Sequence, residues 1–275
     1  MIDNKEYAAA VRAVTAEMFV ARGDGHIGGS FSMADAVAVI FNKYLRKEPH
    51  DWFVLSKGHA GPAYYAALYL THKIPEESLG TLNANGTILP SHPDRNLTPG
   101  VDCSTGSLGQ GISQATGLAY ANKLKKTGAW VYCIIGDGEL NEGETYEALE
   151  FASNKHLGNL IIFLDNNKKQ VDGLIKDVSC DYDYPEFFKG LRLPMVSIDG
   201  NDTDQIDKAI DEIQKSGSDE CHVILMDTVK GKGISYFENL PNCHHMTFNE
   251  NELNILKDFI SANKGAIQDV LENTK

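Results

Sequence analysis

The stretch that decides the fold runs from Gly136 to Gly173: GDGELNEGETYEALEFASNKHLGNLIIFLDNNKKQVDG. A Gly-Asp-Gly turn follows an apolar strand (Trp130–Ile135). A helix, a second apolar strand (Leu160–Leu164) and an Asp-Asn-Asn turn come next. Each polar turn begins where a strand ends, so both are expected at the carboxyl edge of an open parallel sheet. Such sheets bind their ligands at that edge.

The residues of these turns indicate a diphosphate bound through a divalent cation. Glycine amides at a helix N-terminus suit a bare phosphate, but the Asp137 carboxylate between two glycines would repel it. Aspartate and asparagine oxygens are hard ligands that suit Mg²⁺ or Ca²⁺. A dinucleotide fingerprint would place its third glycine three residues after Gly138, whereas here Gly143 comes five residues after it. Ordinary turns are the other alternative, but two such turns on consecutive strands favour a metal site.

The rest of the chain predicts a doubly wound, mostly parallel α/β sheet with helices on both faces. Short runs that are apolar on both faces are typical of buried parallel strands, and they occur at 52–55, 130–135, 160–164, 195–198 and 222–226. Helical patterns lie between them, at about 5–21, 33–45, 62–72, 110–125, 143–155, 203–216 and 250–273. No linker or internal repeat interrupts the pattern, so residues 1–275 are expected to form a single domain.

Composition excludes several classes of function. The net charge of −13 argues against binding to nucleic acid or to acidic membranes. The chain contains no run of 18 apolar residues, so no membrane span is predicted. The first residues lack the basic start and apolar core of a signal peptide. The five cysteines show no metal-binding spacing. We therefore expect a reduced, cytoplasmic protein.

Several blocks of the chain resemble the amino-terminal half of transketolases, which use thiamine diphosphate. The Gly-Asp-Gly and Asn-Asn turns resemble the cofactor signature of that family. Four further blocks fall in the family's order, namely GHIGGSFSMADAV (25–37), FVLSKGHAGPAYYAAL (53–68), SHPDRNLTPGVDCSTGSLGQGIS (91–113) and DTVKGKGISYFEN (227–239). The segment TGSLGQG is the most specific of these. It distinguishes the chain from 1-deoxyxylulose-phosphate synthases and 2-oxo acid dehydrogenases.

The resemblance implies a role for particular residues. His26, His92 and His244 match histidines that contact the donor sugar and relay protons, and His59 matches a contact to the diphosphate. For the cofactor and its metal, the matching positions are Gly106, Ser107 and Leu108 beside the aminopyrimidine, the Gly138 amide at the diphosphate, and Asp137, Asn167 and the Lys169 carbonyl as metal ligands. Glu142 and Glu147 match acids near the family's subunit contact. Histidine suits this chemistry, since its unperturbed pKa lies near 7.

One segment departs from the family pattern. After His244 the family usually has glycine, whereas this chain has His245-Met246-Thr247. Either His244 or His245 therefore remains open as the active-site histidine, and the change also fits an altered substrate. Ser107 stands where many full-length relatives have proline.

The resemblance also implies a partner. In the family, the glutamate that activates the cofactor belongs to a pyrimidine-binding domain, which would follow residue 275. We therefore expect the diphosphate-binding subunit of a split transketolase, two copies of each chain, with Mg²⁺ (or Ca²⁺ or Mn²⁺) and sugar phosphate substrates of the pentose phosphate pathway. The alternatives are a thiamine diphosphate enzyme for a modified sugar or a 2-oxo acid, a non-catalytic regulatory subunit, and a nicotinamide- or flavin-binding module.

Overall fold

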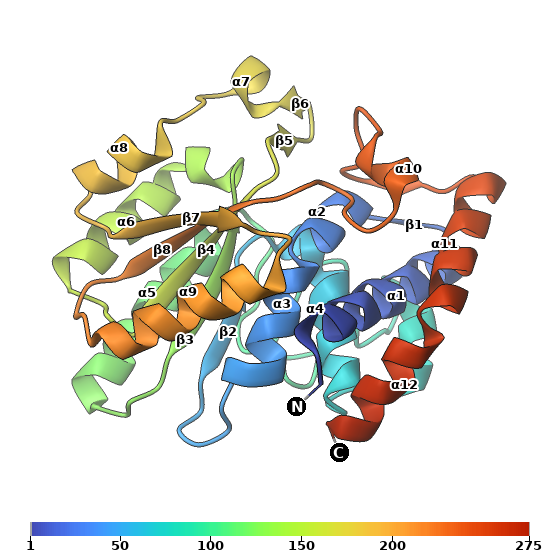
Figure 1. Cartoon of the computed structure of the whole chain (residues 1–275), viewed down its shortest axis with the longest axis horizontal. Coiled ribbons are helices and arrows are strands. Elements are labelled where there is room, and N and C mark those ends of the chain that lie inside the picture. The colour runs from blue at the N-terminus through green and yellow to red at the C-terminus, as the bar shows by residue number, and fades with distance from the viewer. Residues whose placement is uncertain (1, 275) are drawn as a thin grey trace. The chain divides into compact units, whose positions relative to one another are not determined.

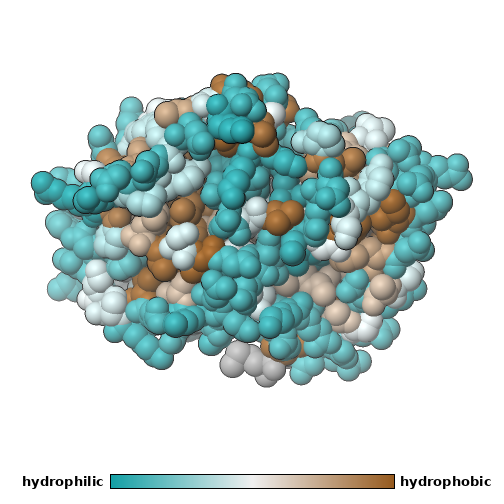
Figure 2. Space-filling model, turned by 45° about the horizontal axis from the view of Figure 1, so that its top comes forward, coloured by the Kyte–Doolittle hydropathy of each residue, from teal (hydrophilic) through white to brown (hydrophobic). Residues whose placement is uncertain are grey.

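A computed structural model describes residues 2–274, and their contacts form two compact units. The first unit contains residues 2–44, 59–104 and 229–274, and the second contains residues 45–58 and 105–228. Among the residues described, no helix is long and apolar enough to cross a membrane. The face drawn in Figure 2 is mostly hydrophilic, with small groups of hydrophobic residues between the polar ones.

A five-stranded parallel sheet forms the centre of the second unit. Its strands lie in the order β2 (Trp52–Leu55), β3 (Val131–Gly136), β4 (Leu160–Asn166), β8 (His222–Asp227) and β7 (Met195–Asp199). Every neighbouring pair is parallel. The sequence predicts all five strands, and β3 and β4 are buried along their whole length. Their apolar residues therefore form the core of this unit.

Helices connect these strands on both faces of the sheet (Figure 1). They are α5 (Gln110–Lys125), α6 (Gly143–Asn154), α8 (Tyr184–Gly190) and α9 (Thr203–Ser216). The chain advances from β2 through β3 to β4, but it returns from β7 to β8. Because crossovers between parallel strands are right-handed, this reversal puts α9 on the face opposite α5 and α6. The predicted doubly wound sheet is confirmed.

Smaller elements follow the strands of the second unit. They are the 3₁₀ turn η4 (Glu139–Asn141), the antiparallel ribbon of β5 (Lys169–Gln170) and β6 (Gly173–Leu174), and the short helix α7 (Ile175–Val178). The sequence did not predict these elements or α8, since each is too short for a clear hydrophobic period.

The first unit is built around the long helix α1 (Asn4–Arg22). Asp3 caps its start by accepting a hydrogen bond from the Lys5 amide at 2.7 Å, and Gly23 ends it with φ of 85°. The helices around it are α3 (Ala34–Val39), α4 (Gly61–Leu70), α11 (Glu250–Ala262) and α12 (Lys264–Asn273). Buried alanines line these helices together with large side chains such as Tyr7, Phe19 and Tyr65, which fill the core of this unit.

Two predicted helices of the first unit need correction. The glycine-rich segment 23–29, where no element was predicted, contains β1 (Asp24–Gly25) and the start of α2 (Ile27–Ser32). The helix predicted over 33–45 is α3 followed by the π-helical turn η1 (Ile40–Tyr44). The helix predicted over 250–273 is α11 and α12, separated at Asn263. The remaining elements are η2 (Gly58–Ala60), η3 (Glu76–Thr81), α10 (Ser235–Glu238) and β9 (Met246–Thr247).

Candidate functional site

The carboxyl edge of the sheet brings the two polar turns of the second unit together. The parallel register pairs Gly136 of β3 with Asp165 of β4. The Asp137 amide donates a hydrogen bond to the Asp165 carbonyl at 3.3 Å, and the Lys168 amide donates to Asp137 Oδ2 at 2.6 Å. The Gly-Asp-Gly turn and the Asp-Asn-Asn turn therefore lie side by side.

Asp137 is a buried carboxylate beside another buried carboxylate. Its side chain is almost inaccessible, and its Oδ1 accepts a hydrogen bond from the Gly138 amide at 2.8 Å. Burial, assisted by the charge of Asp165, raises the pKa of Asp137 to about 6. A divalent cation at this carboxylate would compensate the buried negative charge.

Lys57 and Asp165 form a buried ion pair behind these turns. Lys57 Nζ donates to Asp165 Oδ2, and the exposed fractions of the two side chains are 1% and 0%. Asp165 also accepts from Thr228 Oγ1 and, at 3.2 Å, from Asn167 Nδ2. The ion pair thus holds the Asn167 side chain through a shared carboxylate. Sequence reasoning missed this pair, since its partners lie 108 residues apart.

A second buried acid, Glu139, connects the Gly-Asp-Gly turn to the glycine-rich loop before α5. It accepts hydrogen bonds from Ser56 Oγ, from the Gly109 amide at 2.8 Å and from the Gly136 amide at 3.1 Å. Burial raises its pKa. Glu139 therefore fixes the start of α5 against the turn. The only feature of the sequence that could have indicated this role of Glu139 is its position directly after the Gly-Asp-Gly turn.

The loop 106–108, which is predicted to lie beside the aminopyrimidine, belongs to the same unit and lies next to the carboxyl end of β2. The Thr105 hydroxyl donates to the Leu55 carbonyl at 2.7 Å. A Cβ on Gly58 would lie 2.8 Å from the Gly106 amide nitrogen, so these two backbones are in close contact. Ser107 is exposed and Leu108 is partly exposed. The backbone of this loop is therefore held firmly, while its side chains face outward.

The donor set of the turns fits a hard divalent cation. Asp137 and Asn167 supply a carboxylate and an amide oxygen, which are the atoms that Mg²⁺ prefers. Asn167 Oδ1 accepts the Lys169 amide at 3.2 Å, which fixes the direction of this side chain. Lys169 itself starts the β5–β6 ribbon, paired with Leu174. The chain thus turns sharply at the predicted ligands and presents several oxygen atoms within one short segment.

The four predicted histidines lie together in the first unit. The centroid of the His26 ring lies 5.7 Å from that of His59, 6.2 Å from His92, 5.4 Å from His244 and 4.5 Å from His245. The rings of His59 and His244 are 4.8 Å apart. Four predicted histidines and a fifth, His245, therefore form one cluster, which we call the histidine cluster.

Burial lowers the pKa of two histidines of this cluster. It lowers the pKa of His26 to about 4, with the neighbouring charges of His245, His92 and Lys230 adding to the effect, and it also lowers the pKa of His92. His26 is therefore neutral at pH 7, with one donor and one acceptor nitrogen. The buried Lys230, which belongs to the quoted block 227–239 but was not predicted as a site residue, has its Nζ 3.3 Å from His244 Nδ1.

The predicted residues thus fall into two groups. The second unit brings together Asp137, Gly138, Asn167 and Lys169 with the loop 106–108. The first unit brings together the histidine cluster. Each group therefore brings together residues that the sequence predicted.

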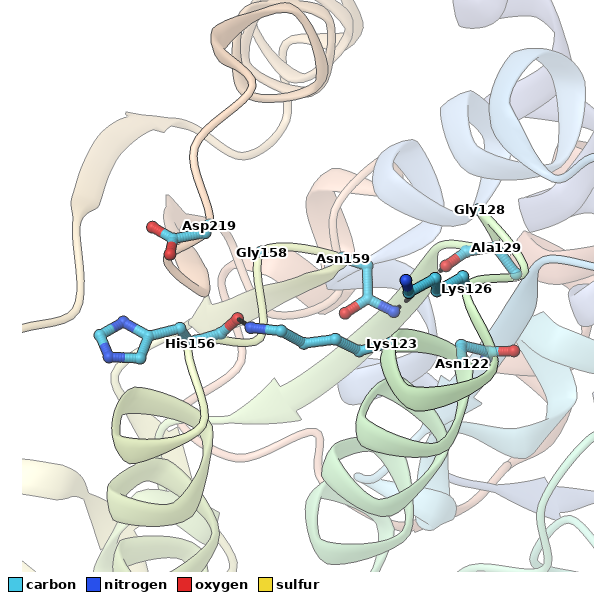
Figure 3. Close-up of a pocket in the computed structure, with 9 residues that line it drawn as sticks. All are labelled: Asn122, Lys123, Lys126, Gly128, Ala129, His156, Gly158, Asn159 and Asp219. Atoms are coloured by element: carbon cyan, nitrogen blue, oxygen red, sulfur yellow. Dashed lines mark hydrogen bonds between the residues drawn. The ribbon is translucent and has the colours of Figure 1, made fainter.

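A separate hollow of about 220 Å³ lies at the other edge of the sheet in the second unit (Figure 3). It is lined by residues that precede strands, including Ala129, Asn159 and Asp219. The Lys123 side chain points across it to the His156 carbonyl, and Asn159 Nδ2 donates to the Ala119 carbonyl at 3.0 Å. It contains none of the predicted site residues.

Comparisons with known proteins identify the family of this chain. Residues 3–270 match the family model described as transketolase, thiamine diphosphate binding domain. The chain is 40% identical over 256 residues to the 6-deoxy-6-sulfo-D-fructose transketolase subunit SqwG of Clostridium sp. strain MSTE9, covering 90% of this chain and 93% of the relative. It is 35% identical over 228 residues to an apulose-4-phosphate transketolase subunit of Actinobacillus succinogenes, covering 80% and 82%.

A solved structure agrees with these relatives. The transketolase of Campylobacter jejuni superimposes with a TM-score of 0.87 at 27% identity, over 99% of this chain. The match covers 46% of the Campylobacter chain. This chain therefore spans a little under half the length of that transketolase.

Proposed function

Because this chain belongs to the transketolase family and carries its thiamine diphosphate-binding domain, we propose that it is the diphosphate- and metal-binding subunit of a two-chain transketolase. The reaction moves a two-carbon ketol unit from a ketose phosphate to an aldose phosphate. The observation that carries the proposal is the buried carboxylate of Asp137 beside Asn167, at the ends of adjacent strands.

In this proposal the chain's own residues bind, orient and move protons. Asp137, Asn167 and the Lys169 carbonyl hold a divalent cation, and the Gly138 amide and His59 face the diphosphate. The backbone of Gly106, Ser107 and Leu108 supports the aminopyrimidine. Bound thiamine diphosphate supplies the electron sink for cleavage of the carbon–carbon bond. His26, being neutral, accepts and returns hydroxyl protons of the sugar, with His92 and His244 beside it.

The partner is part of the proposal. Two relatives of similar length are named as transketolase subunits, and the solved Campylobacter chain is more than twice as long as the matched region. We infer a separately encoded chain with the pyrimidine-binding half, two copies of each chain, and Mg²⁺ as the metal. A cytoplasmic location belongs to the same proposal and is supported by the five cysteines, none of which forms a disulfide in the part of the chain that the structure describes.

The names of the relatives favour a modified sugar as the donor. One is named for 6-deoxy-6-sulfo-D-fructose and another for apulose 4-phosphate. The His245-Met246-Thr247 segment, which departs from the family pattern, lies at the histidine cluster. A modified ketose is therefore the second candidate donor, beside xylulose 5-phosphate.

The test is a ketol-transfer assay with thiamine diphosphate and Mg²⁺. Xylulose 5-phosphate, 6-deoxy-6-sulfofructose and apulose 4-phosphate serve as donors, for this chain alone and co-expressed with a candidate pyrimidine-binding chain. We expect activity only from the pair, lost in Asp137→Ala and kept in Asp211→Ala on the outer face of α9. Activity from the single chain would overturn the two-chain proposal. A pair that assembles and binds cofactor but transfers from no donor would favour a regulatory subunit.

A further inference from the structure

An antiparallel ribbon places a fifth histidine directly opposite His26. The strands β1 and β9 pair Asp24 with Thr247 and Gly25 with Met246. In an antiparallel ribbon each step forward on one strand is a step backward on the other, so the next opposed pair is His26 and His245. Their rings make an edge contact, with centroids 4.5 Å apart and planes at 71°.

Backbone contacts on both sides make this pairing rigid. The Phe248 amide donates to the Gly23 carbonyl at 2.9 Å, and the Gly28 amide donates to the Cys243 carbonyl at 2.9 Å. A Cβ on Gly28 would lie 2.5 Å from the Cys243 carbonyl oxygen, so glycine is needed for this approach. Backbone hydrogen bonds therefore join the two segments on both sides of the histidine pair.

His245 meets His26 from the solvent side. Its side chain is 47% exposed, and its Nε2 lies 3.9 Å from Asp24 Oδ1. Asp24 in turn faces Arg22 Nε at 3.3 Å. His245 therefore lies between Asp24 and His26, and about half of its side chain remains exposed.

We propose that His245 is a further substrate-binding residue, which shares the hydroxyl groups of the donor sugar with His26 and restricts which ketoses are accepted. The inference rests on the proposed transketolase function. A neutral His26 offers one donor and one acceptor nitrogen, whereas a polyol presents several hydroxyls that both donate and accept. A second imidazole in edge contact supplies further hydrogen bonds and also occupies space that a glycine would leave open.

The geometry can be tested without catalysis. Histidine ring resonances of the single chain, followed by NMR over pH, give the pKa of His26. We expect this pKa to rise in His245→Asn, because a neighbouring imidazole charge is removed. In His72→Asn, an exposed histidine elsewhere in the same unit, we expect the pKa of His26 to stay the same. An unchanged pKa in His245→Asn would overturn the pairing.

Binding is tested in the assembled pair. For His245→Asn we expect the KM of the donor sugar to rise roughly fivefold to tenfold, as for one lost hydrogen bond, with thiamine diphosphate affinity unchanged. His245→Gln, whose amide reaches farther from the backbone than that of asparagine, should recover part of this loss. His245→Gly should accept donors that the wild type rejects.

The outcomes separate this inference from the proposed function. An active wild-type pair whose donor KM and donor range are unaffected by all three substitutions would overturn the role of His245 alone. A wild-type pair that assembles with cofactor and transfers from no donor would overturn the transketolase activity, and the role of His245 with it.

Discussion

Replacing Lys57 by methionine should destabilise the second unit strongly. The substitution keeps the length of the side chain but removes the ammonium group that neutralises Asp165. Both side chains are at most 1% exposed, so water cannot replace the lost partner. Removing one member of a buried ion pair costs about 3–5 kcal/mol. The Thr228 hydroxyl and the Asn167 amide still donate to Asp165, which places the expected loss near the lower end of that range.

The chain offers a matched control for this prediction. Lys168 Nζ lies 2.6 Å from Asp227 Oδ1, but these side chains are 63% and 57% exposed. Lys168→Met should therefore cost less than about 1 kcal/mol. Urea denaturation monitored by tryptophan fluorescence measures both, since Trp52 and Trp130 are the only tryptophans and both lie in the second unit.

A double substitution tests the physical cause. Lys57→Met combined with Asp165→Asn should cost less than Lys57→Met alone, because no uncompensated charge then remains buried. Equal losses for Lys57→Met and Lys168→Met would refute the reasoning, since burial would then have no bearing on the pair. A double variant that loses as much stability as Lys57→Met alone would refute it as well.

The remaining predictions concern packing, pH and the metal. On α5, Gly111→Ala should lower the free energy of unfolding, measured in urea, by about 1–3 kcal/mol, because the new Cβ would lie 2.4 Å from the Ser56 Cα. On the same helix, Gly117→Ala should raise it by about 0.5–1 kcal/mol, because no atom lies within 4 Å of the new Cβ. The free energy of unfolding should fall by about 2 kcal/mol, after allowing for the partial exposure of His26, as the pH drops from about 6.5 toward 4. The reason is that His26 binds a proton more readily in the unfolded chain than in the folded one. An equally steep fall of stability with pH in His26→Asn would contradict this. Calorimetry of the assembled pair should show that Asp137→Asn weakens Mg²⁺-dependent thiamine diphosphate binding more than tenfold. Unchanged binding in this variant would contradict the assignment of Asp137 as a metal ligand.

Local patterns were enough to predict most of the fold. The apolar runs identify all five strands of the central sheet, because a parallel strand covered on both faces needs apolar residues throughout. The helices α1, α5, α6 and α9 also lie within two residues of their predicted bounds. Short elements were not predicted, as at α2, which contains Gly28 and Gly29. A two-turn helix with two glycines has no period that a sequence can reveal.

By itself the sequence determined the sheet and the chemistry of its two polar turns, because strands, turns and their order depend on residues close together in the chain. Only the tertiary structure decided that Lys57 neutralises Asp165 and that Glu139 holds the Gly109 amide. It also decided that His245 stands opposite His26, with the ring of His244 near His26 as well. Such pairs join segments far apart in the chain. Their contact depends on strand register and packing, which no local pattern records.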